Sequence, residues 1–210
     1  MIIYAIKIKI IFKGLNITIY DLKPKFQNLL RPIVQNLASK SYTANQVTVW
    51  AWILSFLGGI FVLLGLQSKF FLLLIPFVMF IRMALNAIDG MLAKEHNMKT
   101  KKGAMLNELA DVVSDAMLYL PFAFLINPIV VVLFVVISIF TEFIGVTSQA
   151  VYDDRRYDGP MGKSDRAFVI GLISLLFAFG LSSNILTIIL AIATVLAILT
   201  MINRWKRANK

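Results

Sequence analysis

Oxygen-bearing side chains gather in one stretch of a mostly apolar chain, at the spacing of helix faces. The ones that could act together on one ligand are Asn86, Asp89, Asn107 and Asp111. Residues three or four apart lie on the same face of a helix, so each pair shares a face. Carboxylate and amide oxygens are the donors that Mg²⁺ or Mn²⁺ prefers. The pattern therefore predicts a divalent-metal site between two helices.

Two further acids extend this face. Glu108 and Asp115 fall with Asn107 and Asp111 within an arc of about 100° on a helix. The same acids could instead hold helices together, with Arg82 or a lysine as the counter-charge. Four acids and two amides at one level exceed the buried positive partners that the sequence offers. A shared cation therefore explains the cluster better than interhelical bonding.

These residues must be positioned by helices that cross a membrane. Of the 210 residues, 59% are hydrophobic and 15% are charged, whereas soluble domains carry about a quarter charged residues. We predict an all-α integral membrane fold with six transmembrane helices, because most of the apolar runs approach the ~20 residues needed to cross a bilayer. The predicted spans are Val47–Leu66, Phe70–Ile88, Met105–Ile126, Ile129–Ala150, Ala167–Ser182 and Ile185–Ile202.

The placement of Lys and Arg predicts the orientation. The segment before the first span holds seven, and the two loops and the tail that would share its side hold four each, against Lys69 alone on the other side. Cytoplasmic loops carry an excess of basic residues, so both termini should be cytoplasmic, in the cell (inner) membrane. The net charge of +10 lies between apolar spans, which favours contact with anionic lipid and not nucleic acid.

The N-terminal region, residues 1–45, should form an extension and an amphipathic helix, followed by a six-helix catalytic domain at 46–210. Apolar residues repeat at helical spacing over Leu22–Leu37, which is typical of a helix lying in the membrane interface. Such a helix could cover a lipid-entry groove or simply anchor the chain. The apolar run of Met1–Ile19 is too short to span, and we expect a poorly ordered extension there.

The segment NAIDGMLAKEHNMKTKKGAMLNELAD resembles the signature of the CDP-alcohol phosphatidyltransferases, DxxDGxxAR followed by a loop and GxxxDxxxD. Its positions fall on Asn86, Asp89, Gly90, Ala93, Lys94, Gly103, Asn107 and Asp111. The likeness is specific over residues 86–111 and extends to the six-helix layout. It implies an enzyme that moves a substituted phosphoryl group from a CDP-linked lipid to an alcohol and releases CMP, with CDP-diacylglycerol as the expected donor.

The resemblance also implies residue roles. Asn86, Asp89, Asn107 and Asp111 would hold Mg²⁺ or Mn²⁺, and Asp111 would also take the proton of the acceptor hydroxyl. The nucleotide would lie against Gly90, Ala93, Lys94 and Gly103. A homodimer is the family expectation.

Three signature positions differ in this chain. Asn86 and Asn107 replace aspartates, and Lys94 replaces arginine. Each Asn keeps a ligand oxygen but loses a negative charge, which should weaken metal affinity. Glu108 and Asp115 lie on the same helix face and are candidates to compensate. The pattern is similar to that of a poorly characterised bacterial branch of the family.

The segment between the fourth and fifth spans is rich in cations. Its candidate acceptor-binding residues are Arg155, Arg156, Lys163 and Arg166. Cations beside an acidic metal site could bind an anionic group such as a phosphorylated alcohol. They could equally serve as topology signals and contacts to lipid headgroups.

Two other functions compete with a lipid-synthesis enzyme. Intramembrane acids also serve ion-coupled transporters, but here they gather at one membrane face and no inverted repeat is evident. The second alternative is a family member without catalysis that acts as a binding or assembly subunit. The absence of cysteine excludes thiol chemistry, and a single histidine excludes a multi-histidine metal site.

Overall fold

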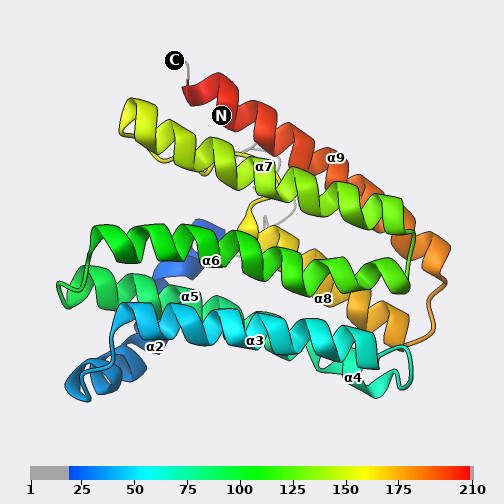
Figure 1. Ribbon diagram of the computed structural model, residues 1–210, viewed down its shortest axis with the longest axis horizontal. Coiled ribbons are helices and arrows are strands. Elements are labelled where there is room, and N and C mark those ends of the chain that lie inside the picture. The colour runs from blue at the N-terminus through cyan, green and yellow to red at the C-terminus, as the bar shows by residue number, and fades with distance from the viewer. Residues whose placement is uncertain (1–18, 209–210) are drawn as a thin grey trace.

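Helices run through the described part of the chain, residues 19–208, in the computed structural model (Figure 1). The elements are α2 (Ile19–Ser39), α3 (Ala44–Leu64), α4 (Phe70–Leu73), α5 (Ile75–Glu95), α6 (Lys101–Tyr119), the 3₁₀ helix η1 (Leu120–Phe124), α7 (Pro128–Tyr152), α8 (Lys163–Ala178) and α9 (Ser183–Ala208). The predicted all-α class is confirmed, since residues 19–208 form no strand. The predicted extension Met1–Ile19 lies, except for Ile19, outside the described residues.

Local sequence signals set several helix ends. Thr43 begins α3 with a capping box, in which its hydroxyl accepts from the backbone of Gln46 and the Gln46 side chain accepts from the backbone of Thr43. Thr100 caps α6, and Asn127 caps α7. Pro76 lies in the first turn of α5, where a missing backbone N–H costs nothing. The second apolar span is therefore two helices, α4 and α5, which meet at Leu74.

Four stretches are long and apolar enough to cross a membrane. They are Ala44–Leu64, Phe70–Glu95, Pro128–Tyr152 and Ser183–Ala208. Large apolar side chains such as Phe77, Phe143 and Ile188 point outward from them, as expected when lipid surrounds the helices. Helix α6 carries three acids, and α8 has only 16 residues, so neither has the composition and length of a membrane-crossing helix by itself.

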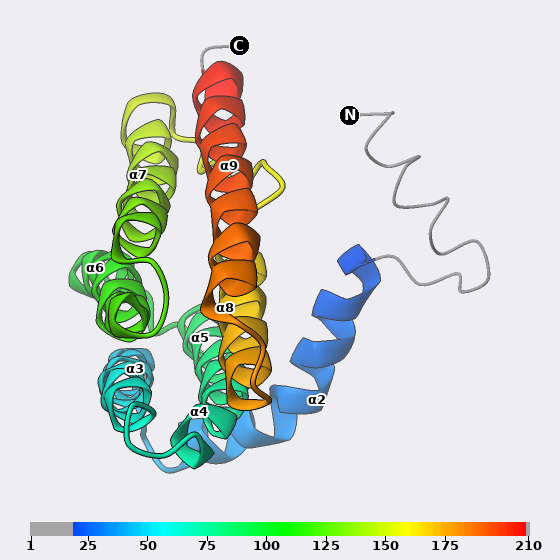
Figure 2. The ribbon, with the colours of Figure 1, turned by 90° about the vertical axis from the view of Figure 1, so that its right-hand side faces the viewer.

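The helices pack in two groups. Helix α3 packs against α5 and α6, α5 packs against α8, and α7 lies along α9 in both views (Figures 1 and 2). A continuous apolar core joins the groups, and its largest members include Leu72, Tyr119, Phe122, Phe134 and Leu190. The core therefore fixes how the polar segments of α5, α6, α7 and α8 face one another.

Helix α2 lies at the periphery, where it contacts α5 (Figure 2). Leu30 and Val34 are buried against Ile88 and Leu92 of α5, whereas Leu29 on the opposite side is 72% exposed. The helix therefore has one face on the protein and an apolar residue facing away from it.

Helix α8 begins inside the bundle, opposite the middle of α6. The ammonium of Lys163, the first residue of α8, contacts the carboxylate of Asp111 in the third turn of α6. The segment 153–162 therefore returns from the end of α7 into the bundle. This inward return explains why α8 is short.

Candidate functional site

The signature residues of α5 lie in its last turns, where the helix approaches α3. The carboxylate of Asp89 is buried, and its Oδ2 accepts a hydrogen bond of 2.9 Å from the hydroxyl of Thr48. Thr48 lies on the first turns of α3, which the Thr43 capping box fixes. One oxygen of Asp89 is thus oriented by α3, and the carboxylate remains within electrostatic range of Asp111 and Lys163.

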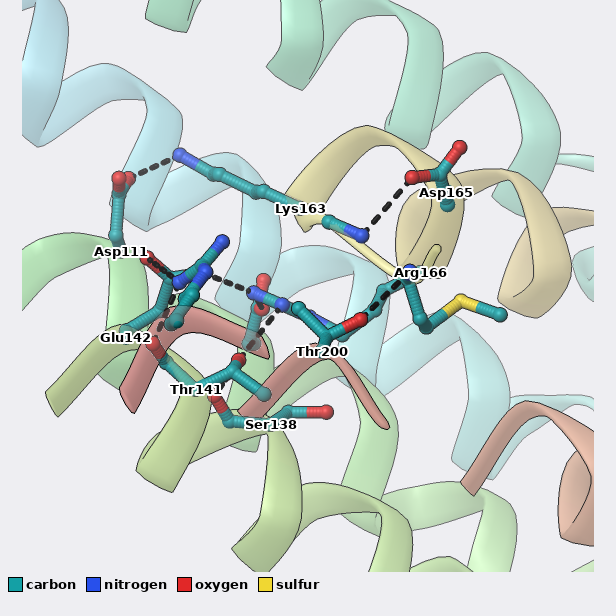
Figure 3. Close-up of polar contacts among 12 residues, drawn as sticks. Asp111, Ser138, Thr141, Glu142, Lys163, Asp165, Arg166 and Thr200 are labelled. Carbon is teal, nitrogen blue, oxygen red and sulfur yellow. Dashed lines mark hydrogen bonds and ion pairs between the residues drawn. The ribbon is translucent and has the colours of Figure 1, made fainter. Parts of the chain in front are cut away.

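Asp111 on α6 faces the start of α8. Its Oδ1 contacts Nζ of Lys163, as Figure 3 shows, and its side chain is 18% exposed. The backbone carbonyl of Asp111 accepts a hydrogen bond of 3.4 Å from Arg82 of α5. The carboxylate is therefore placed at a junction of three helices while staying partly accessible.

The two asparagines of the signature are half-buried on the same two helices as the aspartates. Asn86 lies one turn before Asp89 on α5, and Asn107 one turn before Asp111 on α6. Within residues 24–208, no group of three or more His, Cys, Asp or Glu side chains is arranged to hold a metal ion. A site here would therefore depend on the two amide oxygens besides the two carboxylates.

The two asparagines and two aspartates of the signature offer oxygen donors for a divalent cation, and the ammonium of Lys163 already brings a positive charge to Asp111. The ammonium of Lys163 contacts the carboxylate of Asp111 and lies within electrostatic range of the carboxylate of Asp89, so both acids lie near one positive charge. Oxygen donors of this kind suit Mg²⁺ or Mn²⁺. A bound cation would share Asp111 with the lysine or replace it there.

The two signature glycines have different surroundings. A Cβ on Gly90 would meet no atom within 4 Å, so that side of α5 is open. A Cβ on Gly103 would lie 2.5 Å from Oδ1 of Asn45 and 2.9 Å from the Thr100 hydroxyl. Gly103 therefore allows α6 to start close to α3, whereas Gly90 leaves room for a ligand.

The neighbouring residues Ala93 and Lys94 have different surroundings. Ala93 packs against the cluster formed with α2, and Lys94 is exposed. Lys94 makes no ion pair within the described part of the chain, so its ammonium is available to an anionic ligand.

A buried ion-pair network lies one turn beyond Asp111. Asp115 is 4% exposed, with Oδ1 2.6 Å from Arg82 and Oδ2 3.1 Å from Arg166. This network joins α5, α6 and α8. The carboxylate of Asp115 is thus already neutralised by two guanidinium groups. It therefore does not replace the negative charge that the metal site lacks at Asn86 and Asn107.

Glu142 of α7 is the second centre of this network. Its carboxylate lies 2.9 Å from Arg166, 3.3 Å from Arg155 and 3.5 Å from Arg204. Figure 3 shows Glu142 and Arg166 beside Thr141, whose hydroxyl accepts a hydrogen bond of 3.1 Å from Arg166. One acid therefore connects α7, α8, α9 and the segment 153–162.

Arg155 links this network to the signature helix. Its guanidinium contacts Glu108 of α6 in addition to Glu142. Burial lowers the pKa of Arg155, but the hydrogen bond and charge of Glu108 outweigh burial, so its pKa is raised. Glu108 is thus paired with an arginine, beside the predicted metal residues.

The four cations proposed at the sequence level are all ion-paired. Arg155 and Arg166 bind the acids described above, and Lys163 binds Asp111. Arg156 lies 3.2 Å from Asp154 and donates a hydrogen bond of 2.7 Å to the backbone carbonyl of Arg207. The structure therefore places three of them around the site and directs Arg156 toward the end of α9.

Sequence reasoning did not assign three residues that the structure brings into this region. Thr48 orients Asp89, Glu142 collects three arginines, and Arg204 reaches into the network from α9. Glu142 gave one signal in sequence, as a charged residue within an apolar run, whereas Arg204 follows the last apolar run. The partner of each depends on packing between distant helices.

An apolar groove of about 390 Å³ opens beside the site, between α5 and α8. Its lining includes Met79, Phe80 and Met83 of α5 and Ser164, Phe168 and Leu172 of α8. Ser164 directly follows Lys163, so one end of the groove lies next to the acidic residues.

Comparison with known proteins gives the same fold and a family. Phosphatidylinositol phosphate synthase (PgsA1) of Mycobacterium tuberculosis is similar in structure in two solved forms. The form with CDP-DAG bound has a TM-score of 0.70 at 19% identity and covers 84% of this chain and 92% of its own. The form in complex with manganese and citrate has a TM-score of 0.71 at 19% identity and covers 85% and 88%.

A relative of higher identity is the inner membrane protein YnbA of Escherichia coli (strain K12). It is 47% identical over 192 residues, which cover 89% of this chain and 94% of the relative. The family model of the CDP-alcohol phosphatidyltransferases matches residues 41–202, which include the signature, the helices α3 to α8 and most of α9. The chain is therefore a multi-pass membrane protein and a transferase of substituted phosphate groups, and it belongs to the CDP-alcohol phosphatidyltransferase family.

Proposed function

We propose that this protein transfers a phosphatidyl group from CDP-diacylglycerol to a small alcohol, releases CMP and requires a divalent cation. The observation that carries the proposal is the contact of Lys163 with Asp111 of α6, with Asp89 of α5 within electrostatic range of both residues. The solved relatives hold CDP-DAG in one form and manganese in another, which supports this donor and this kind of cation.

Asn86, Asp89, Asn107 and Asp111 would hold Mg²⁺ or Mn²⁺ here. The cation would supply charge neutralisation to the diphosphate of the donor, which is the main requirement in phosphoryl transfer. Thr48 fixes the orientation of Asp89, and Arg82 fixes the backbone at Asp111. The chain itself therefore provides a preorganised set of oxygens.

The donor would approach from the α5 side of the site. The open space at Gly90 admits a phosphate group, and the exposed ammonium of Lys94 is free to pair with it. Ala93 and Gly103 keep α5 close to α2 and α6 close to α3. We assign the acyl chains of the donor to the apolar groove between α5 and α8, because the groove begins beside Lys163.

The acceptor would enter on the side of segment 153–166, near Arg155, Lys163 and Arg166. Arg156 would shape the same loop. The acceptor oxygen forms a bond to the lipid-bearing phosphorus, and the bond from that phosphorus to the oxygen shared with CMP breaks. Asp111, whose carboxylate is partly accessible, takes the proton of the acceptor hydroxyl as general base.

In the membrane, we infer six crossings, with both termini in the cytoplasm and the protein in the inner membrane. Helix α6 extended by η1 reaches the length of a crossing and packs against α3 and α7. Asp111 and Asp115 of α6 form ion pairs with residues of α5 and α8. Helix α2 would lie in the membrane interface, because one of its faces packs against α5 and the apolar side chain of Leu29 points away from the protein. A homodimer is the expected assembly.

A second candidate role follows from one observation. The signature here has two carboxylates, and one of them is paired with Lys163. A family member with this reduced charge could bind a CDP-lipid or a partner protein without turnover. An assay of metal binding in the presence of CDP shows whether the chain binds a divalent cation together with the nucleotide. An assay of CMP release shows whether the chain is an enzyme or only a binding subunit.

The proposal is tested by measuring CMP release from CDP-diacylglycerol by the purified chain in lipid nanodiscs, with Mg²⁺ or Mn²⁺ and a panel of alcohols. We expect release that depends on the cation, the acceptor and Asp111. A matched control is Asp153→Asn, which alters an exposed acid at the end of α7. No release with any acceptor, or equal release by Asp111→Asn, would contradict the proposal.

A further inference from the structure

The cations that face the acceptor side are already neutralised by acids of this chain. Arg155 is held between Glu108 and Glu142, and Arg166 between Asp115 and Glu142. These contacts join different helices, so they are part of the packing and not loose surface pairs. Each of these two guanidinium groups already contacts two carboxylates, which weakens its attraction for a dianion.

The Nε donors of these arginines are buried. The Nε atoms of Arg155, Arg166 and Arg204 have no hydrogen-bond partner, yet each is buried from solvent. A phosphate that took the place of an acid at these guanidinium groups would displace its carboxylate. Glu108 or Glu142 would then be left as an unpaired acid beside the incoming phosphate, an arrangement that is strongly unfavourable.

Lys163 is the one cation near the site, among the described residues, whose acid partner belongs to the proposed metal set. A divalent cation at Asp111 would release at most this single ammonium. A phosphate monoester carries about 1.5 to 2 negative charges at neutral pH, so one ammonium does not balance it. The metal itself favours all acceptors alike, because it neutralises the diphosphate of the common donor.

The side of the site where the donor would bind carries cations that are not ion-paired. Lys94, Lys99, Lys101 and Lys102 are exposed and make no ion pair within residues 24–208. Lys94 lies in the last turn of α5, one turn after Gly90, and the other three lie in the following loop and at the start of α6. Free positive charge is thus present where a diphosphate would lie and is compensated where the acceptor would lie.

We infer that the acceptor is a non-phosphorylated hydroxyl compound, either an uncharged polyol or an amino alcohol, and that Glu108 and Glu142 exclude phosphorylated alcohols. The inference rests on the proposed function and defines its substrate class. The two glutamates are specificity-determining residues: they occupy the arginines that a phosphate would need, and they favour a neutral or positively charged group.

The test compares acceptors that differ only by a phosphate. The protein in nanodiscs with CDP-diacylglycerol and Mn²⁺ receives glycerol or glycerol 3-phosphate, inositol or inositol 1-phosphate, and ethanolamine or phosphoethanolamine, and CMP release is measured. In the pair of compounds that gives the fastest CMP release, we expect kcat/KM to be at least about tenfold higher for the compound without a phosphate. A higher value for the phosphorylated members overturns the inference and leaves the transferase intact.

Glu108→Gln frees Arg155 on the more accessible side and should fold, since Glu108 is half-exposed. We expect this variant to raise kcat/KM for the phosphorylated alcohol by about tenfold relative to kcat/KM for the same alcohol without its phosphate. Glu95→Gln is the matched control, because it breaks the exposed pair with Arg31 and should leave the ratio unchanged.

Thermal unfolding of each variant shows that a changed ratio does not reflect misfolding. An unchanged ratio in a folded Glu108→Gln protein overturns the role of Glu108. CMP release with none of the six compounds contradicts the proposed transferase itself, and with it this substrate class.

Discussion

The ammonium of Lys163 contacts Oδ1 of Asp111, although the two residues are 52 positions apart in sequence. The contact places the first residue of α8 against the third turn of α6. It joins a residue of the family signature to one that lies outside it. Several testable consequences follow from this pair and from the acids around it.

Replacing Asp111 with Asn should abolish CMP release, because an amide cannot accept the hydroxyl proton and contributes no negative charge. The residue is partly accessible, so we expect the variant to remain folded. The measurement is CMP release at saturating Mn²⁺, with thermal unfolding as a check. Activity within about twofold of the unaltered protein would exclude the general-base role, which typically contributes 10²–10⁴-fold.

Replacing Lys163 with Met should strengthen Mn²⁺ binding in the absence of nucleotide. The ammonium lies at the carboxylate that would bind the cation, and its removal leaves Asp111 without a competing positive charge. We expect an affinity gain of about tenfold, which corresponds to about 1.4 kcal/mol. Electron paramagnetic resonance of free Mn²⁺ measures the affinity, with Lys69→Met, at the N-cap of α4, as the control. Weaker binding would show that Lys163 helps to assemble the site.

The double variant Asn86→Asp with Asn107→Asp should also bind Mn²⁺ more tightly. It restores two carboxylates at positions on the same helices as Asp89 and Asp111, and an added carboxylate attracts the cation more strongly than an amide. The same resonance measurement applies. Asn28→Asp, on an exposed position of α2, provides the matched change in charge and should have no effect. Equal affinities would place Asn86 and Asn107 outside the metal site.

Replacing Asp115 with Asn should destabilise the fold. Its carboxylate is buried between Arg82 and Arg166, and breaking a buried pair leaves uncompensated charge at a cost of about 3–5 kcal/mol. Glu95→Gln, in an exposed pair, should cost at most about 1 kcal/mol. Chemical unfolding in detergent micelles compares the two. Equal stability of both variants would mean that the network contributes nothing to folding.

The two signature glycines should respond differently to Ala. Gly90→Ala introduces a methyl group into open space, so the fold should be kept, with a gain of up to about 1 kcal/mol in helix propensity. CDP binding should weaken, because the added group narrows the proposed nucleotide site. Gly103→Ala must displace Asn45 and the Thr100 cap, and should lose about 1 kcal/mol of stability. Calorimetric titration with CDP and thermal unfolding separate these effects, and unaltered CDP binding by Gly90→Ala would contradict its assignment.

The sequence by itself determined the class of fold and the family. Apolar composition and hydrophobic runs predict membrane helices, because lipid requires backbone hydrogen bonds to be satisfied within each helix. The spacing from Asn86 to Asp111 is enough to identify the signature, since helical periodicity places these residues on defined faces. Capping residues such as Thr43 also act locally, and the structure confirms that cap.

Only the tertiary structure decided which charges meet. The acidic face of α6 contains Glu108, Asp111 and Asp115, yet each has a different partner: Arg155, Lys163, and Arg82 with Arg166. Helical spacing fixes the direction of a side chain around its own axis, but the partner depends on how neighbouring helices are placed and where α8 starts. The acceptor class that we propose depends on this pairing, because a guanidinium that already contacts acids of its own chain attracts an anion less strongly.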